Sequence, residues 1–296
     1  MKKSKLVPII VAVLLLLVVT PFPAKAETNS ERTDLEGVKV AVFGETVSMV
    51  VSSGIALHAM FEWMNASVEY LYGEDIRAGE LEDFDILAMP GGQMSAYYAA
   101  LDTDGIENIR QWIANGGSYF GICGGALFAA TTPRFGMYNG TYGLVVDGDY
   151  TSLHLATMNV NTTCGGPDLS EIPDSFETLY WGSSYFTPDV GFEYIPLARY
   201  NENDGPGMIA FEYQAGNVFL SSPHPEYEEG SMRDGTAEFD EFDDPDTEWN
   251  FLLQIAIWQV ESSMESNLVV GIPLFEITAI GIVGVVLIII INQRRK

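Results

Sequence analysis

The sequence predicts an α/β fold, in which helices cover both faces of a doubly wound, mainly parallel sheet, with a C-terminal transmembrane helix. Three observations support this fold class. Between residues 38 and 122, short apolar runs alternate with segments of helical spacing, which is the pattern of parallel βαβ units. A glycine-rich corner at 121–125 joins an apolar strand to a helix of small residues. The run 268–291 is long and apolar enough to cross a bilayer.

The N-terminal half supplies its strands and helices alternately. Short runs rich in aliphatic and aromatic residues predict strands at 38–44, 67–72, 83–89 and 118–122. The segment 47–65 is predicted to be a helix because Leu57, Phe61 and Met64 recur at helical spacing. Isoleucines at 106, 109 and 113 indicate a second helix, and Gly116 and Gly117 end it.

From residue 137 to residue 213 the pattern changes to short strands separated by turns. The runs 194–200, 208–213 and 217–220 predict a hairpin-rich edge that leads into Ser221–Glu226. A final amphipathic helix is predicted from Trp249 to Val260.

Both ends of the chain have the composition of targeting segments. Lysines, an apolar run and Ala24-Lys25-Ala26 give residues 1–26 the form of a signal peptide. The 24 residues of 268–291 would form a helix of about 36 Å, and the basic tail 292–296 favours a cytoplasmic C-terminus. The expected organisation is a signal peptide (1–26), a linker (27–37), one domain (38–262), a tether (263–267), a membrane anchor (268–291) and a tail (292–296).

The charge and the sequons bear on location and partners. The 41 acidic residues outnumber the 14 basic ones, for a net charge of −27. Such a field repels nucleic acid. Sequons at Asn65, Asn139 and Asn161 agree with a domain outside the cell. The acidic run 234–248 lacks the ligand spacing of a calcium loop, so it is interpreted as a solvated loop and no metal is predicted.

The corner Gly121-Ile-Cys123-Gly-Gly125 resembles a nucleophile elbow. Its glycines suit a strained strand-to-helix turn, and amides at the helix start can bind an oxyanion. The alternative is that Cys123 is a small buried hydrophobic residue. Against this stands the segment around His224 and Glu226, because its prolines favour extended backbone, which directs both side chains to one face. There the imidazole can take a thiol proton while the carboxylate orients it.

Four stretches carry a resemblance to a known family. They are 86–92, 109–126, 180–186 and 221–226, and they occur in the family's order. The chain resembles the class I glutamine amidotransferase-like superfamily, and most closely the N-terminal amidotransferase-like domain of biotin-protein ligases. The resemblance implies a flavodoxin-like sheet. No region resembles the ligase's own biotin and ATP site.

The resemblance also implies roles for individual residues. Cys123, His224 and Glu226 would form the catalytic triad, and the backbone amides of Gly92 and Gly124 would bind the oxyanion. No cofactor is implied.

Other residues are candidates for the wall of a pocket. Glu45 follows the first predicted strand, where ligands bind in doubly wound folds, and Gln93 follows the glycine pair. Tyr180 and Tyr185 lie in an aromatic stretch that lines the pocket or simply packs on the sheet. Cys164 is either a free thiol or, in an oxidising compartment, a partner for Cys123.

Three functions fit the sequence. The first is a surface-anchored thiol hydrolase or amidase acting on a small amide, peptide or ester. The second is a glutaminase subunit that needs a synthase partner, and the third is a non-catalytic binding module. The expected partners are a small-molecule or peptide substrate and the membrane, through the C-terminal helix, but not nucleic acid. The expected location is the cell membrane, single-pass, with the domain outside.

Overall fold

A computed structural model describes residues 32–44, 51–131, 135–144, 149–228, 232–242 and 248–270. Several predicted features lie outside these residues: the signal peptide 1–26, residues 27–31 of the linker, Glu45 and the tail 292–296. The helices and strands below belong to one structural unit, which begins at Thr33.

The elements follow the chain in this order. The first half holds β1 (Lys39–Phe43), α2 (Val51–Trp63), β2 (Ser67–Leu71), α3 (Gly73–Ala78), η1 (Glu80–Asp83), β3 (Ile86–Met89), α4 (Met94–Ala114), β4 (Ser118–Ile122) and α5 (Gly124–Thr131). The second half holds β5 (Gly140–Leu144), β6 (Leu153–Val160), β7 (Ser175–Trp181), β8 (Ser184–Pro188), β9 (Ile195–Tyr200), β10 (Pro206–Tyr213), β11 (Gly216–Ser221) and α6 (Glu248–Val270).

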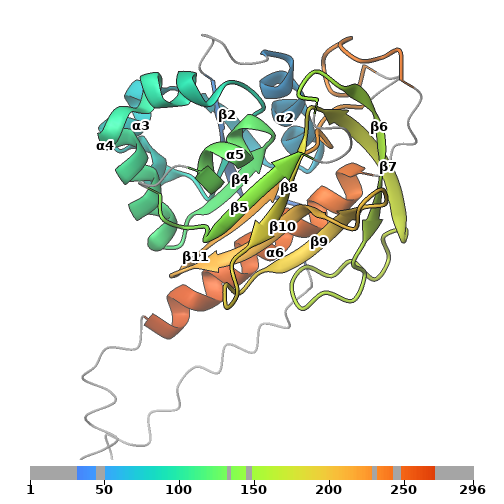
Figure 1. Ribbon diagram of the computed structural model, residues 1–296. Coiled ribbons are helices and arrows are strands. Elements are labelled where there is room, and N and C mark those ends of the chain that lie inside the picture. Colours follow the sequence, from blue (N-terminus) through green and yellow to red (C-terminus); the bar gives the residue numbers. More distant parts are fainter. Residues whose placement is uncertain are drawn as a thin grey trace, which may run out of the picture. The chain divides into compact units, whose positions relative to one another are not determined.

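The main sheet has the strand order β2-β1-β3-β4-β11-β10-β9-β6-β7 (Figure 1). From β2 to β11 all neighbouring strands are parallel. Every residue of β3 and β4 is buried, as expected for parallel strands that helices cover on both faces. Parallel strands end at one edge of a sheet, so the segments that follow β3, β4 and β11 meet there.

The other half of the sheet corrects one prediction. From β11 through β10, β9 and β6 to β7, neighbouring strands are antiparallel, and β5 and β8 form a separate antiparallel pair. The expectation of a mainly parallel sheet is therefore wrong for this half. The antiparallel pairs β9–β10 and β10–β11 confirm the hairpins predicted there, but these strands lie inside the sheet and not at its edge. Parallel neighbours need a crossover the size of a helix, and the described part of 153–221 contains strands and turns without one.

Two apolar cores lie on opposite faces of the sheet, which confirms the predicted doubly wound arrangement. One core contains Leu57 and Phe61 of α2 together with Leu252 and Ile255 of α6. The other contains the isoleucines of α4 and Phe128 of α5. The side chains of β1 alternate between the two cores, with Val40 and Val42 in the first and Ala41 and Phe43 in the second.

The C-terminal helix corrects two further predictions. The tether expected at 263–267 is part of α6, which continues to Val270. In the part of the chain that the structure describes, no helix is both long and apolar enough to cross a membrane, so the transmembrane helix is not found there. Residues 271–291 of that predicted span lie outside the described residues. The apolar residues of α6 are instead used against the sheet, where Leu252 and Ile255 are fully buried.

Candidate functional site

Cys123 lies alone between the end of β4 and the start of α5. Its φ is +44°, a left-handed conformation that is uncommon outside glycine and costs energy. A Cβ atom on Gly124 would lie 1.8 Å from the carbonyl oxygen of Gly92, and one on Gly125 would lie 2.3 Å from that of Met89. The glycines after Cys123 are thus required by the close approach of the β3–α4 turn.

His224 and Glu226 lie in the segment that follows β11, at the same edge of the sheet. The His224 amide donates a hydrogen bond to the carbonyl of Leu179 in β7, 2.9 Å away. Its Nδ1 atom lies 2.9 Å from Oε1 of Glu226, and both side chains are almost completely buried. The carboxylate therefore orients the ring, as the extended His-Pro-Glu segment predicted.

The fold brings Cys123 beside this pair although about a hundred residues separate them. The Cys123 amide donates to the carbonyl of Ser221 at 2.7 Å, which extends the pairing of β4 with β11. Burial alone would lower the pKa of His224, but the charges of Cys123 and Glu226 beside the ring raise it well above 6.5. Because Glu226 engages Nδ1, Nε2 is the ring nitrogen left for the thiol.

The turn 90–92 lies against the elbow. The Gly125 amide donates to the carbonyl of Pro90 at 3.2 Å. Gly124 is the first residue of α5, so its amide is among those that a helix leaves without an intrahelical partner. A Cβ atom on Gly91 would approach Cε1 of His224 to 2.6 Å, so the turn also touches the imidazole.

The predicted pocket residues have different surroundings. Gln93 is exposed at the N-cap of α4, directly after Gly92. Tyr180 is fully buried in β7 and stacks on His154 with ring centroids 4.5 Å apart, which favours the sheet-packing interpretation. Tyr185 is half-buried in β8, where Cβ atoms on Gly143 and Gly205 would touch its ring. Glu45 lies outside the described residues.

Ser53 is a site residue that the sequence reasoning missed. Its hydroxyl donates to Oε1 of Glu226 at 2.6 Å and accepts from the amide of Gly91 at 2.8 Å. The sequence feature that could have identified it is the pair Ser52-Ser53 at the start of α2. This helix follows β1 and therefore begins at the carboxyl edge of the sheet. Small polar residues at that edge favour a role in the site.

Three buried tyrosines interact electrostatically with Cys123. Burial raises the pKa of Tyr97, Tyr200 and Tyr227 well above the usual value, and the charge of Cys123 adds to each shift. These side chains therefore remain neutral hydroxyls at physiological pH.

Both cysteines are free thiols, so the alternative of a Cys123–Cys164 disulfide is not realised in the structure. The sulfur of Cys164 lies 3.5 Å from the carbonyl oxygen of Pro167, and burial raises the pKa of its thiol. The two thiols therefore have different surroundings.

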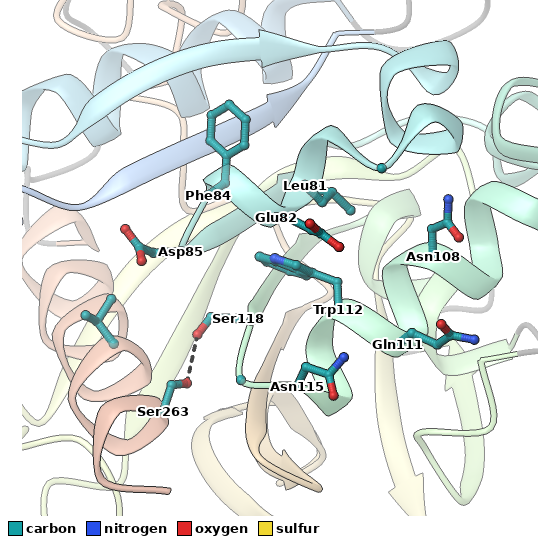
Figure 2. A pocket seen from close by; sticks show the side chains of 14 residues that line it. Leu81, Glu82, Phe84, Asp85, Asn108, Gln111, Trp112, Asn115, Ser118 and Ser263 are labelled. Carbon is teal, nitrogen blue, oxygen red and sulfur yellow. Dashed lines mark hydrogen bonds between the residues drawn. The ribbon is translucent and has the colours of Figure 1, made fainter. Parts of the chain in front are cut away.

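A pocket of about 470 Å³ lies at the other edge of the sheet (Figure 2). Ser118, at the start of β4, lines it, while Cys123 follows the end of that strand, roughly 16 Å away at 3.3 Å per residue. The amide of Asn108 in its wall donates to the carbonyls of Ile76 and Arg77, and the amide of Gln111 donates to Glu107. This pocket is not part of the Cys123 site.

Comparisons with known proteins match the region of the elbow. The family model described as "Biotin-protein ligase, N terminal" matches residues 81–153, which include β3, α4, β4 and α5. A biotin--protein ligase of Schizosaccharomyces pombe is 25% identical over 165 residues, which are 49% of this chain and 26% of the ligase. The chain thus matches a small part of that ligase.

Two bacterial relatives match over a larger share of their length. An uncharacterized protein of Chlamydia muridarum is 28% identical over 160 residues, with 49% of this chain and 62% of that protein covered. The pyridoxal 5'-phosphate synthase subunit PdxT of Corynebacterium jeikeium is 31% identical over 162 residues, with 52% of this chain and 75% of that subunit covered.

The fold also matches a solved structure. A thua-like protein from Bacteroides uniformis superimposes with a TM-score of 0.52 over 77% of this chain and 94% of that one, at 12% identity. Such low identity supports the fold alone. The similarity to the synthase subunit is closer, and it shows that the chain belongs to the class I glutamine amidotransferase-like superfamily.

Proposed function

We propose that the chain is a thiol hydrolase or amidase that acts on a small amide, peptide or ester. The observation that carries the proposal is the buried hydrogen bond of 2.9 Å between His224 and Glu226, with Cys123 on the free side of the imidazole. A thiol, an oriented imidazole and a carboxylate behind it are the groups that covalent acyl transfer requires.

In the proposed reaction the Cys123 thiolate attacks the substrate carbonyl carbon. The carbonyl π electrons move to oxygen, and the amides of Gly92 and Gly124 would bind this oxyanion. When the intermediate collapses, the bond to the leaving group breaks, and the His224 imidazolium gives its proton to the departing amine or alkoxide. Water then attacks the thioester carbon and His224 takes the water proton. The carbon–sulfur bond breaks, which releases the acid product and restores the Cys123 thiolate beside the imidazolium. Glu226 holds Nδ1 throughout.

The experiment uses the reduced full-length chain and a small activated ester, with intact mass spectrometry. We expect an acyl adduct on Cys123 that the variant Cys123→Ala lacks and that His224→Ala forms much more slowly. Absence of an adduct from the reduced wild-type chain would contradict the proposal and leave the non-catalytic binding module as the better account.

A glutaminase subunit is the second candidate, and the similarity to a synthase subunit favours it. Glutamine separates the two functions. Ammonia release from glutamine that depends on Cys123 would identify a glutaminase, especially if a synthase partner accelerates it. Turnover of other amides or esters, with glutamine untouched, would favour the independent hydrolase.

We also propose that the domain acts outside the cytoplasm. The signal-like residues 1–26 support this location, and the sequon residues Asn65 and Asn139 are exposed. N-terminal sequencing of the chain from its native host tests it, because a secreted domain would begin near Glu27. An intact N-terminus on a cytoplasmic protein would contradict this location.

A further inference from the structure

The side chain of Ser53 connects three segments of the site. Ser53 lies in the first turn of α2 and is fully buried. Its hydroxyl touches Glu226 of the His-Pro-Glu segment and Gly91 of the turn after β3. These segments are far apart in sequence, and only the folded chain brings them into contact with the Ser53 hydroxyl.

The direction of both hydrogen bonds follows from the chemistry of the groups. An amide N–H can only donate, so the Ser53 hydroxyl accepts from Gly91. Its own proton is then free to go to Glu226, and an ionised carboxylate only accepts. The short distance of 2.6 Å is that of a hydrogen bond to a charged oxygen.

One oxygen of the Glu226 carboxylate, Oε1, takes part in both of its hydrogen bonds to the side chains of Ser53 and His224. Oε1 accepts from Ser53 and is bonded to Nδ1 of His224, whereas Oε2 has no hydrogen-bond partner among the described residues. Removing the Ser53 hydroxyl would therefore leave His224 as the one side-chain partner of the carboxylate. It would also leave the buried Gly91 amide without its acceptor.

We propose that Ser53 is a positioning residue that locks the Glu226 carboxylate to the 90–92 turn, so that the imidazole and the proposed oxyanion amides keep one relative geometry. The inference rests on the proposed function of Cys123, because the geometry that Ser53 fixes is that of the base. Without the serine, Glu226 can turn away from His224, and the imidazolium that stabilises the thiolate is no longer held in place.

The test is the pH dependence of alkylation of Cys123 by iodoacetamide in the full chain. The variant Ser53→Ala removes the hydroxyl. The matched control is Ser52→Ala, since Ser52 is the adjacent buried serine and bonds to Tyr227 instead. At pH 6.5 we expect Ser53→Ala to react at least about tenfold more slowly than wild type, which is about 1.4 kcal/mol. At pH 9.5, above the ordinary thiol pKa of about 8.5, the two rates should agree within about twofold, because the thiolate forms unaided.

Rescue separates positioning from a general loss of structure. Ser53→Thr keeps the hydroxyl, so its rate at pH 6.5 should return to within about threefold of wild type. Ser52→Ala should match wild type at both pH values. Equal rates for wild type and Ser53→Ala at pH 6.5 would overturn the role of Ser53 alone, and so would a threonine variant as slow as the alanine one. A wild-type thiol inert at pH 6.5 would instead overturn the proposed function itself.

Discussion

The two edges of the parallel sheet differ in how they use polar groups. At the carboxyl edge, His224, Glu226 and Ser53 are buried and bonded to one another beside a strained cysteine. At the amino edge lies the pocket of about 470 Å³ that Figure 2 shows. The carboxamides of Asn108 and Gln111 in its wall are nevertheless engaged by neighbouring protein groups.

The volume of a cavity therefore does not identify the candidate catalytic site in this fold. Burying ionisable groups costs free energy, so an imidazole, a carboxylate and a thiol kept together by the fold mark a candidate functional site. The amino-edge pocket lies between η1, α4, the start of β4 and α6, and no buried imidazole or thiol is among the residues that line it.

Thiol reactivity should show the largest contrast. We expect iodoacetamide to modify Cys123 at least about 100-fold faster than Cys164 near neutral pH, because burial raises the pKa of Cys164 and no imidazole assists it. Peptide mapping after timed alkylation measures both rates in one sample. Comparable rates at the two cysteines would remove the chemical distinction of the carboxyl edge.

The pocket supplies the control for that measurement. The variant Trp112→Ala deletes the indole that stands in the middle of the pocket in Figure 2. Because the sites are far apart, the Cys123 rate should change by less than about twofold. A large change would show that the two edges are coupled.

Backbone crowding gives the second contrast. Gly124→Ala puts a methyl group 1.8 Å from the backbone oxygen of Gly92, so we expect a loss of at least about 3 kcal/mol in the free energy of unfolding. Gly54→Ala in α2 is the matched control, because its Cβ meets nothing within 4 Å. That change should stabilise the helix by about 0.5–1 kcal/mol. Urea unfolding measures both, and a tolerated Gly124→Ala would show that the elbow can relax.

Removing the imidazole should have a smaller effect on reactivity. We expect His224→Ala to slow alkylation of Cys123 near neutral pH by at least about tenfold, or about 1.4 kcal/mol, because the positive partner of the thiolate is lost. His154→Ala is the control, since His154 stacks on Tyr180 instead. An unchanged rate in His224→Ala would contradict the role of His224 as base.

The parallel half of the fold was predictable from the sequence and the second half less so. Strand-length apolar runs located β1, β3 and β4, whose residues are almost all buried. Alternation with helical segments located β2 as well, although most residues of this edge strand are not buried. The hairpins of β9, β10 and β11 were predicted from short runs separated by turns. The direction in which β6 and β7 pair was not, because periodicity does not report how turns return the chain. The continuation of α6 through 263–267 was missed because the segment is polar, and polar residues fit an exposed helix face as well as a tether.

The candidate site was predictable where a local pattern determines the geometry. Glycines around Cys123 and prolines around His224 set backbone shape, so their placement at one edge followed from the fold class. Ser53 was missed because its role depends on a contact across 173 positions with Glu226. For Tyr180 the aromatic neighbourhood left pocket lining and sheet packing both open, and its complete burial favours packing.

The last contrast concerns the protonation of His224. Its pKa is raised in the folded chain, so the stability that its protonation contributes is complete below pH 6.5, its ordinary value, and is lost as pH rises through the folded pKa. In Cys123→Ser the thiolate charge is gone while burial still lowers the pKa of His224, so the His224 titration should move to lower pH.

The sequence has three histidines, so imidazole NMR can follow all of them, and His58→Gln and His154→Gln assign the signals. Trp112→Phe, at the other edge, should leave the His224 curve in place. A curve that does not move in Cys123→Ser would mean that the thiol and the imidazole are not coupled, and the two edges would then differ in shape alone.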